Sequence, residues 1–424
     1  MSKVELTLPY SDAATLSFAL DERQLGEVIR PQRLKPEEDE DAAIRVALDA
    51  PLGAPRLEDA LRPGSRVLIL SDDNTRPTPV ARILPHLLER LSRAGVQDEK
   101  VEILIASGTH RPMTPEEIRA KLGPEVVRRI PASCHRCHER GDLYRAGKTP
   151  EGVEIWLNRK LLEADFILGI GNVVPHPQPG WSGGAKILYP GVAGAQTIAA
   201  FHLVGAEDPT NYLGREDAPA RRSLESLAET VGLNFIVDTV LTADQQLYGV
   251  YCGNPRQAQA AAQRASKAVY GVAVKHPYRI VVSNSYPAFL EFWQAGKGIF
   301  SADLILEPGG TIILTTPCPE GVGVTHPKQV EYMGLAIGDL LKRIAARELE
   351  DPIAAAVCAK VKQVMERARV FVVSDGLARE DLRAMHFTPF ASVEEALAAA
   401  LTEYGQDTKV AVITHGGETV PHLV

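Results

Sequence analysis

One lysine stands in a segment whose composition could support chemistry. Residues 176–191 read HPQPGWSGGAKILYPG, so four glycines and three prolines surround Lys186. The ten residues on either side of this lysine include no Asp or Glu. Because glycine lets the backbone bend sharply and approach a ligand closely, such a segment either binds an anion or carries a reactive amine.

Histidines flank this segment and also follow an earlier apolar run. His176 opens the segment between two prolines, which stiffen it, and His110 comes directly after VEILIASGT (101–109). Histidine titrates near neutral pH, so both are candidates for general acid and base catalysis. His202, in AAFHLVG, lies 16 residues beyond the lysine and on its own reads as a packed helix residue.

A second polar segment, SDDNTRPTP (71–79), supplies further donors. Thr75 and Arg76 offer a hydroxyl and a guanidinium as donors where a phosphate or carboxylate could bind, and Asp73 lies just before them. Thr78 has an alternative interpretation as the N-cap of a helix that begins with Pro79. Capping does not require Arg76, which therefore keeps its interpretation as a ligand-binding residue.

Ser182 lies in a G-x-S-x-G pattern typical of serine hydrolases. That motif needs a strand running directly into the serine and a helix directly after it, and prolines on both sides of this segment argue against both. A serine hydrolase therefore stays as the rival interpretation. Gly183 and Gly184 also resemble half a phosphate loop, although the G-x-x-x-x-G-K-[ST] spacing is not met.

Two other segments carry chemistry-bearing side chains. CHRCH (134–138) looks like half a zinc site, but no second ligand pair exists among the five cysteines, so a loop facing the site or no function stays open. FWQAGKG (292–298) brings Trp293, Gln294 and Lys297 together. This segment is either a helix N-terminus with a solvated lysine or a carboxylate clamp.

Apolar runs and helical patterns alternate along the chain and predict an α/β fold. Strands are expected at 65–73, 101–110 and 164–174, and helices at 79–95 and 114–123, the second with a capping box of Thr114 and Glu117. This order predicts mostly parallel sheets flanked by helices. Ligands bind outside the carboxyl ends of such strands, so the loops after these three strands should converge on one site.

The second half repeats the pattern, with strands expected at 279–286, 310–317, 369–376 and 409–417 and a helix-to-loop stretch at 297–307. A chain of 424 residues exceeds one ordinary core. We therefore expect a cofactor-binding domain at 1–270 and a second domain at 275–408, with the active site in the cleft between them. The first 30 residues are interpreted as small strands on the first domain, to which the final strand, about 409–424, could return.

Composition narrows the class of protein. Hydrophobic residues make up 45% and charged residues 24%, with a net charge of −8 and no dense Lys/Arg cluster, which argues against nucleic acid as a partner. No apolar run reaches the roughly 18 residues that a membrane helix needs. The odd cysteine count and an N-terminus without the apolar core of a signal peptide predict a cytoplasmic enzyme.

Five segments together resemble the lactate racemase family that uses a nickel-pincer nucleotide. They are DNTRPTP (73–79), SGTHRPMT (107–114), PHPQPGWSGGAKILYPGV (175–192), FH (201–202) and WQAGKG (293–298). In order and spacing they span most of the chain. The resemblance implies two domains that enclose a cleft in which the nucleotide is tethered to a lysine and nickel is bound by a histidine.

The resemblance also implies a role for each matching residue. Lys186 matches the tethering lysine, His202 the nickel ligand, and His110 and His176 the two acid/base histidines. Arg76 and Lys297 match the clamp on the substrate carboxylate, and Gln294 the partner of its hydroxyl. The remaining matches are Asp73, which orients the cofactor or Arg76; Thr75, Ser182, Gly183 and Gly184, beside the cofactor; and Trp293, which shapes the substrate pocket at a position where a tyrosine is familiar in the family.

The activity implied is racemisation or epimerisation at C2 of a 2-hydroxy acid by reversible hydride transfer, with lactate as the default substrate. Separate maturation enzymes would make the cofactor. CHRCHER (134–140) departs from the histidine followed by acidic residues that is usual in the family, so the roles of His135 and His138 stay open. An alternative that is also compatible with the resemblance is that the protein binds or carries the cofactor without turning over a substrate. The motifs specify neither the substrate side chain, nor the stereochemical preference, nor the oligomeric state.

Overall fold

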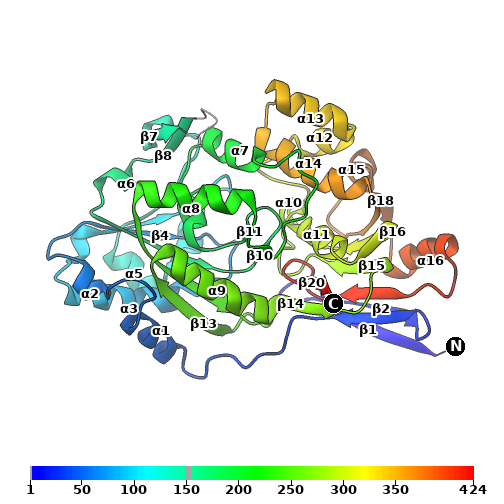
Figure 1. Cartoon of the computed structure of the whole chain (residues 1–424), viewed down its shortest axis with the longest axis horizontal. Helices are drawn as coiled ribbons and strands as arrows, with labels where there is room; N and C mark the ends of the chain where they lie inside the picture. The colour runs from blue at the N-terminus through cyan, green and yellow to red at the C-terminus, as the bar shows by residue number, and fades with distance from the viewer. Residues whose placement is uncertain (1, 149–153) are drawn as a thin grey trace.

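Two six-stranded sheets form the centres of two domains that lie side by side (Figure 1). The computed structural model describes residues 2–148 and 154–424. The strands of the first sheet run parallel apart from β13 at one edge. Their order is β13 (Leu247–Gly253), β12 (Leu233–Leu241), β9 (Phe166–Asn172), β4 (Val67–Ser71), β5 (Val101–Ile105) and β6 (Ala132–Cys134).

Helices cover both faces of the first sheet because its strands are apolar on both sides. Along β4, Val67 and Ile69 pack on one face, and Leu68 and Leu70 on the other. The first face is covered by α1 (Glu40–Asp49), α2 (Leu57–Ala60), α3 (Val80–Arg93), α4 (Pro115–Leu122) and α5 (Pro124–Arg129). The second is covered by the hairpin of β7 (Leu143–Lys148) and β8 (Glu154–Asn158) and by α6 (Lys160–Glu163), α7 (Ala195–Leu203), α8 (Pro219–Val231) and α9 (Pro255–Tyr270).

All neighbouring strands of the second sheet are parallel. Their order is β18 (Thr388–Phe390), β17 (Ala368–Val373), β16 (Leu306–Thr315), β15 (Tyr278–Asn284), β19 (Val410–Ile413) and β3 (Leu25–Ile29). One face carries α10 (Phe292–Ala295), α11 (Lys297–Asp303), α12 (Gln329–Gly334), α13 (Ile337–Ala346), α14 (Pro352–Met365) and α15 (Arg379–Ala384). The other carries α16 (Val393–Tyr404) and the hairpin of β1 (Lys3–Pro9) and β2 (Thr15–Asp21).

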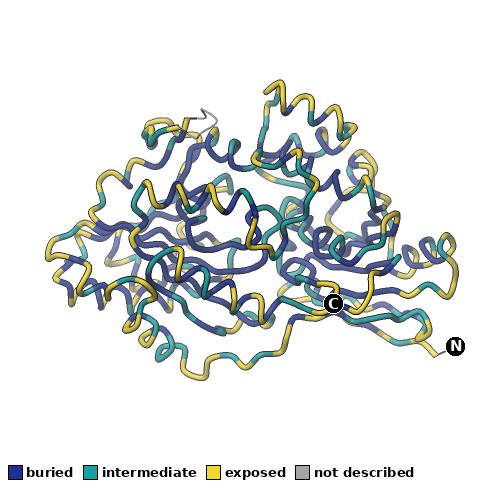
Figure 2. Tube along the Cα trace, viewed as in Figure 1, coloured by how far each residue is buried: buried dark blue, intermediate teal, exposed yellow. Residues whose placement is uncertain are grey.

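The predicted α/β class is confirmed, and so are the strands and helices that define it. The capping box before α4 forms as expected, because the Thr114 hydroxyl accepts from the Glu117 amide at 3.3 Å and the Glu117 carboxylate accepts from the Thr114 amide at 2.7 Å. The central strands β4 and β9 of the first sheet are buried throughout, and β15 and β16 of the second sheet are buried toward their carboxyl ends (Figure 2). These strands hold fixed the loops that follow their carboxyl ends.

The placement of the chain ends in the first domain was wrong. β3 and β19 pair with each other in the second sheet, and the apolar side of the β1–β2 hairpin, which includes Leu8 and Phe18, packs on that sheet and α16. β20 (Val420–Leu423) instead pairs with β14 (Gly271–Val274) where the chain passes between domains. Alternating apolar residues reveal a buried face but not which sheet buries it. The domain boundary near residue 270 stays a prediction.

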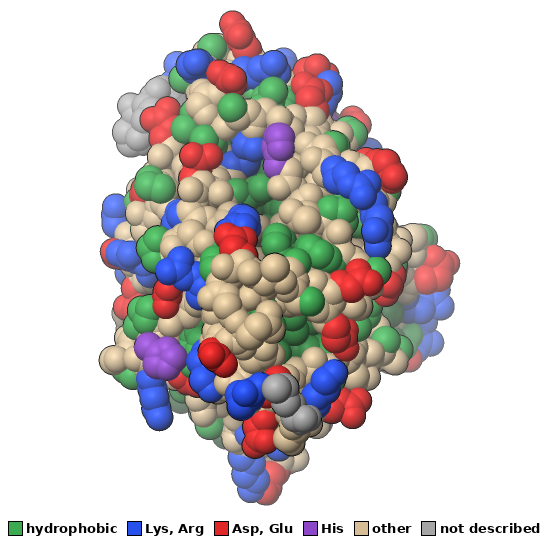
Figure 3. Space-filling view, turned by 90° about the vertical axis from the view of Figure 1, so that its right-hand side faces the viewer, with side chains coloured by type: hydrophobic (Ala, Val, Ile, Leu, Met, Phe, Trp, Pro, Cys, Tyr) green, Lys and Arg blue, Asp and Glu red, His purple; other side chains and the backbone are tan. Residues whose placement is uncertain are grey.

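Acidic and basic side chains are interspersed over the surface at the second-sheet end of the molecule, without a large area of one sign (Figure 3). Among the helices of the described residues, none is long and apolar enough to span a membrane.

Candidate active site

A cavity of about 190 Å³ lies between the two domains, where the loops after β4, β5 and β9 meet. As predicted, these loops converge at the carboxyl edge of the first sheet. The first domain contributes Asp73, Arg76, His110, His176, Ser182, Gly183, Lys186 and His202, and the second contributes Trp293, Gln294 and Lys297. The structure thus brings together most of the residues singled out in the sequence, and Thr75 and Gly184 lie outside this lining.

The glycine-rich segment after β9 folds into a compact loop of β10 (Pro175–His176), β11 (Gly180–Trp181) and the 3-10 turn η3 (Gly184–Ile187). The Ser182 hydroxyl fastens this loop, because it donates to the Asn172 carbonyl at 2.6 Å and accepts from the Val174 amide at 2.8 Å. Both hydrogen bonds join the Ser182 hydroxyl to the backbone. Among the described residues, no histidine is a partner of this hydroxyl. Ser182 therefore lacks the base that a hydrolase nucleophile needs.

The two glycines after Ser182 are required by close packing inside the protein, because neighbouring protein atoms occupy the space where a Cβ would lie. A Cβ on Gly183 would lie 2.5 Å from Val173 and 2.9 Å from the Asp238 carboxylate. A Cβ on Gly184 would lie 2.4 Å from Gln259. Gly183 borders the cavity and Gly184 does not. The Gly184 amide donates to Asp238 at 2.8 Å, and the expected place of both glycines beside a cofactor stays a prediction.

Lys186 reaches the cavity from η3, and its amine has no carboxylate partner among the described residues. Burial lowers the pKa of this amine well below its usual value, and the positive charges of Arg76 and Lys297 lower it further. A lysine with a lowered pKa carries a free electron pair near neutral pH, so it can act as a nucleophile. This environment suits covalent attachment of a ligand.

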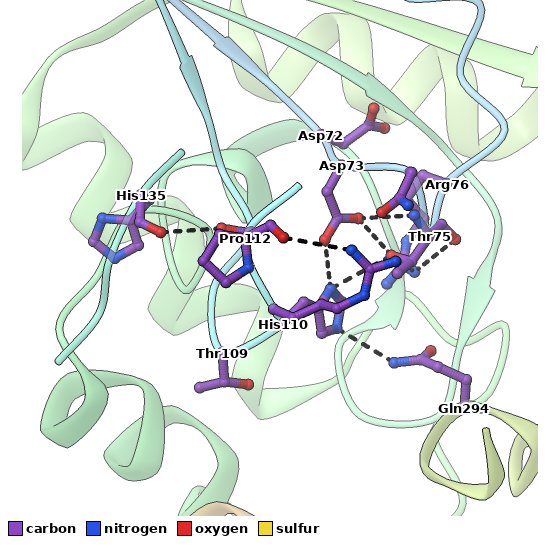
Figure 4. Close-up of polar contacts among 12 residues, drawn as sticks. Asp72, Asp73, Thr75, Arg76, Thr109, His110, Pro112, His135 and Gln294 are labelled. Atoms are coloured by element: carbon purple, nitrogen blue, oxygen red, sulfur yellow. Dashed lines mark hydrogen bonds and ion pairs between the residues drawn. The ribbon is translucent and has the colours of Figure 1, made fainter. Parts of the chain in front are cut away.

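His110 is oriented by a buried carboxylate (Figure 4). Its Nδ1 lies 2.6 Å from Oδ2 of Asp73, whose other oxygen accepts from the Thr75 amide at 3.1 Å and hydroxyl at 2.5 Å. Although burial raises the pKa of Asp73, the charge and hydrogen bond of His110 and the charge of Arg76 hold it well below its usual range. An ionised Asp73 places the ring proton on Nδ1, which leaves the Nε2 lone pair free to accept a proton.

Thr75 and Thr78 stabilise the loop after β4; Thr75 also lines a second cavity, and its predicted place beside the cofactor stays a prediction. Thr75 bonds Asp73 and accepts from Nη1 of Arg76 at 3.0 Å, which fixes the guanidinium. Thr78 donates to Asp72, and the N-cap of α3 is Pro79 without a side-chain cap. The alternative interpretation of Thr78 as an N-cap is therefore wrong, because its hydroxyl satisfies a buried carboxylate instead.

His176 has the opposite arrangement of its ring nitrogens. Its Nδ1 accepts from the Gln178 amide at 3.2 Å, so the proton of the neutral ring is on Nε2. Burial lowers the pKa of His176 well below its usual value, and Lys186, Lys297 and Arg76 add to the effect. The cavity thus contains one histidine with a lone pair on Nε2, which faces the Gln294 amide, and one with a proton on Nε2.

Arg76, Gln294 and Lys297 form a group of donors contributed by both domains. The Gln294 amide nitrogen lies 3.4 Å from Nε2 of His110 (Figure 4). Burial and the charge of Arg76 lower the pKa of Lys297 to about 7, while the nearby Glu418 opposes them. Two cations near a neutral amide can bind and orient a carboxylate. Charge repulsion between them would fall when an anion binds.

His202 lies on α7 beside the same cavity, with its ring edge-on to Phe201 at 5.2 Å. Burial lowers the pKa of His202 to about 3, and the charge of Lys186 contributes, so the imidazole is neutral and able to bind a metal. No group of three or more His, Cys, Asp or Glu within residues 2–148 and 154–424 could hold a metal ion. A metal bound by His202 would therefore need further ligands from a bound group.

The CHRCH segment does not supply them. His135 is buried outside the cavity, with Nε2 2.8 Å from the Ala193 carbonyl and Nδ1 3.1 Å from the Asn158 amide. Cys137 packs in the apolar core, and His138 is exposed. The zinc interpretation of this segment is wrong for the described residues, because its histidines and cysteines point to different environments.

Sequence reasoning missed two residues of the second domain. His326 is buried, stacks on Trp293 with ring centroids 3.8 Å apart, and bonds Asp351 at 2.9 Å. Glu418 is buried beside Lys297, and burial raises its pKa to about 7. Both follow strands of the second sheet, β16 and β19, so the rule for strand-end loops would have found them had it been applied there.

Comparison with known proteins identifies relatives over nearly the whole chain. Residues 10–214 match the family model described as lactate racemase N-terminal domain, and residues 274–420 that of the lactate racemase C-terminal domain. Lactate racemase of Thermoanaerobacterium thermosaccharolyticum is 27% identical over 427 residues, 98% of each chain. Lactate racemase of Lactiplantibacillus plantarum is 28% identical over 424 residues, 97% of this chain and 98% of the relative.

Solved structures agree with this assignment. The lactate racemase apoprotein from Thermoanaerobacterium thermosaccharolyticum superposes with a TM-score of 0.89 at 26% identity, covering 99% of this chain and 100% of that one. A protein from Thermotoga maritima gives a TM-score of 0.71 at 23% identity, covering 91% and 98%. The second likeness bears on the fold alone.

Proposed function

The chain belongs to the lactate racemase family, and from this premise we propose that it is an isomerase that inverts C2 of a 2-hydroxy acid, with lactate as the reference substrate. The observation that carries the proposal is the environment of His110. Asp73 fixes its Nδ1 at 2.6 Å, and its Nε2 lies in the cavity beside the Gln294 amide and close to the Arg76 network. A base and donors for a carboxylate thus lie side by side.

We propose a nickel-pincer nucleotide as the cofactor, since the donor set fits such a group. Lys186 offers an amine of lowered pKa for covalent attachment, and His202 a neutral imidazole for nickel. When bound, the group would supply a reversible acceptor for the C2 hydrogen, which leaves a planar 2-keto acid that can be reduced again on either face. Enzymes that make the cofactor are then required partners.

The carboxylate clamp and the base act on different groups of the substrate. Arg76 and Lys297 bind the substrate carboxylate, and Gln294 donates to its hydroxyl oxygen, so that the hydroxyl proton points to Nε2 of His110. His110 takes this proton, and the carboxylate of Asp73 stabilises the imidazolium that forms. Charge is thereby balanced within the buried pair.

His176 serves the opposite face of the substrate. Its Nε2 proton can hydrogen-bond to the oxygen of the reoriented keto acid, and once the ring has gained a second proton the imidazolium can return one to that oxygen and become neutral again. An anionic substrate between Arg76 and Lys297 offsets the positive charges that lower the pKa of His176. Substrate binding therefore prepares His176 to hold and return a proton, which is the role of the second acid/base group.

The test uses protein produced together with the cofactor-making enzymes. Intact mass, nickel content and interconversion of D- and L-lactate are measured on the parent protein and on His110→Ala, His176→Ala and Lys186→Ala. We expect both histidine variants to retain the adduct and nickel but to lose interconversion, and the lysine variant to lose the adduct. Full activity in either histidine variant would contradict its assigned role.

Two rivals give different results in the same experiment. A cofactor-binding protein without catalysis would carry nickel and turn over no 2-hydroxy acid. A hydrolase would lose its activity in Ser182→Ala and keep it in Lys186→Ala. The Ser182 hydroxyl is already hydrogen-bonded to the backbone, which argues against the hydrolase. Asp73 orients His110 as a base, which argues against a protein that binds the cofactor without catalysis.

A further inference from the structure

The helix that carries His202 ends one residue after it. α7 stops at Leu203, and the amide of Ala206, which a longer helix would turn toward the His202 carbonyl, donates instead to Leu203 at 3.0 Å. The helix itself therefore supplies no donor for the His202 carbonyl. Because helix ends fray, the residue assigned to the metal lies where an α-helix is least fixed.

One glutamine of the glycine-rich segment supplies the missing donor. Nε2 of Gln178 donates to the carbonyls of Phe201 at 2.9 Å and of His202 at 3.1 Å. The side chain of Phe201 is fully buried, with its ring edge-on to Tyr189 at 5.4 Å. Two side chains of one loop thus hold the end of α7, Tyr189 through its ring and Gln178 through its amide.

The backbone of Gln178 is itself well fixed. Gln178 is the middle residue of the turn between β10 and β11, and its neighbours Pro177 and Pro179 have restricted φ angles. Its own backbone amide donates to Nδ1 of His176 at 3.2 Å. The bond that sets the tautomer of His176 and the bond that holds the His202 carbonyl therefore come from a single residue.

We infer that Gln178 is a positioning residue that fixes His176 and His202 relative to one another. The inference rests on the proposed function, in which His176 is an acid/base group and His202 binds nickel. Gln178 borders the cavity, but its amide nitrogen is bonded to the end of α7, so it acts through the two histidines. Groups that hold a metal-binding histidine in place account for about 10- to 100-fold in metal affinity or activity.

The second domain holds the chain beyond α7 in a similar way. α7 and α14 lie side by side between the two domains (Figure 1). From α14, Nε2 of Gln363 donates to the Ala206 carbonyl at 2.7 Å, and Nζ of Lys360 donates to the Thr210 carbonyl at 3.0 Å. These bonds hold the loop after the helix and leave the His202 carbonyl to Gln178.

The experiment replaces Gln178 by Met, which has a similar length but cannot donate, and by Asn, whose amide ends about 1.5 Å nearer the backbone. Both variants keep the backbone amide that bonds His176. On the cofactor-loaded protein, release of nickel to a chelator is followed, and kcat and KM for lactate are measured. We expect nickel release to become about tenfold faster or more and kcat to fall about tenfold or more. KM should stay within about threefold, because the substitutions leave the carboxylate clamp in place.

Gln363→Met is the matched control. It removes the same kind of hydrogen bond from a buried glutamine, at a carbonyl that lies beyond the end of α7. The control should lower the Tm of the apoprotein and leave nickel release and kcat within about threefold. If it accelerated nickel release as much as Gln178→Met does, the effect would be a general loosening of the fold, and the inference would be overturned.

The outcomes separate the role of Gln178 from the function on which it rests. If the parent protein binds nickel and interconverts lactate, but nickel release is unchanged in the Gln178 variants, the positioning role is wrong and the isomerase stands. Either variant alone decides this, so the test survives if the other fails to fold. A raised KM with unchanged kcat would make Gln178 a substrate contact and would also overturn the inference. If the parent carried no nickel, the proposed function would fail, and the inference with it.

Discussion

Replacing Asp73 by Asn tests the orientation of His110 with a change of one atom. In the parent, Oδ2 of Asp73 accepts the Nδ1 proton of His110 at 2.6 Å in a buried site. Asparagine can keep the Oδ1 bonds to Thr75, but its Nδ2 donates toward Nδ1. The imidazole must then carry its proton on Nε2, where the substrate hydroxyl needs a lone pair.

The magnitude follows from two losses. Restoring the productive tautomer against the new hydrogen bond costs about 1.5–3 kcal/mol, which is about 10- to 150-fold in rate. The imidazolium formed in the reaction also loses a buried anion as its partner, a loss of comparable size. We expect kcat to fall by about 10²- to 10⁴-fold, the range that removal of a general base produces.

The assay follows lactate interconversion at saturating substrate, with nickel content and intact mass measured on the same samples. Asp72→Asn is the matched control, because Asp72 is also buried but bonds Lys121 at 2.8 Å and Thr78 rather than a histidine. The control should change thermal stability and keep kcat within about threefold. If Asp73→Asn with its cofactor bound also stayed within about threefold, the reasoning on the tautomer of His110 would be refuted.

Three further changes have outcomes set by the structure. Lys186→Met should raise the Tm of the apoprotein while abolishing the adduct, because burial of an amine with a lowered pKa costs stability at neutral pH; a lower Tm would contradict this. The pKa of Lys297 is about 7, so the clamp loses charge as pH rises through that value. KM for lactate should rise above it, and Lys297→Arg should flatten the profile; a parent KM that is constant between about pH 6 and 9 would argue against the assignment. Ser182→Ala should destabilise by about 1–3 kcal/mol in denaturant unfolding, because Val174 loses its acceptor and Asn172 its donor, while isomerase activity persists.

Much of the first-domain side of the site could be predicted from the sequence. Short apolar runs that end in segments rich in glycine and proline place Asp73, His110 and His176 after parallel strands, and the geometry of such sheets brings these ends together. The hydrogen bonds that give each histidine its tautomer could not be predicted. They depend on side chains and amides whose directions are set only after packing, such as the Gln178 amide on His176.

The second-domain side was less accessible to sequence reasoning. His326 and Glu418 follow β16 and β19, where the rule for strand-end loops could have placed them near the site, but no motif links them to the glycine-rich loop. Their burial and contacts come from tertiary packing, which single-sequence patterns do not encode. The same limit explains the error over β3, a strand of five residues whose partner β19 is near the other end of the chain.

The pairing of β3 with β19 has a consequence for how the protein is made. Ile29 accepts from Thr414, 385 positions later in the chain. At about 5–20 residues per second, a ribosome needs roughly 20–80 s between the two. For that time β3 lacks its neighbour in the second sheet, and the apolar side of the β1–β2 hairpin, with Leu8 and Phe18, stays uncovered. Strands that are made early thus wait for partners that are made much later, and their apolar side chains stay in contact with water during synthesis.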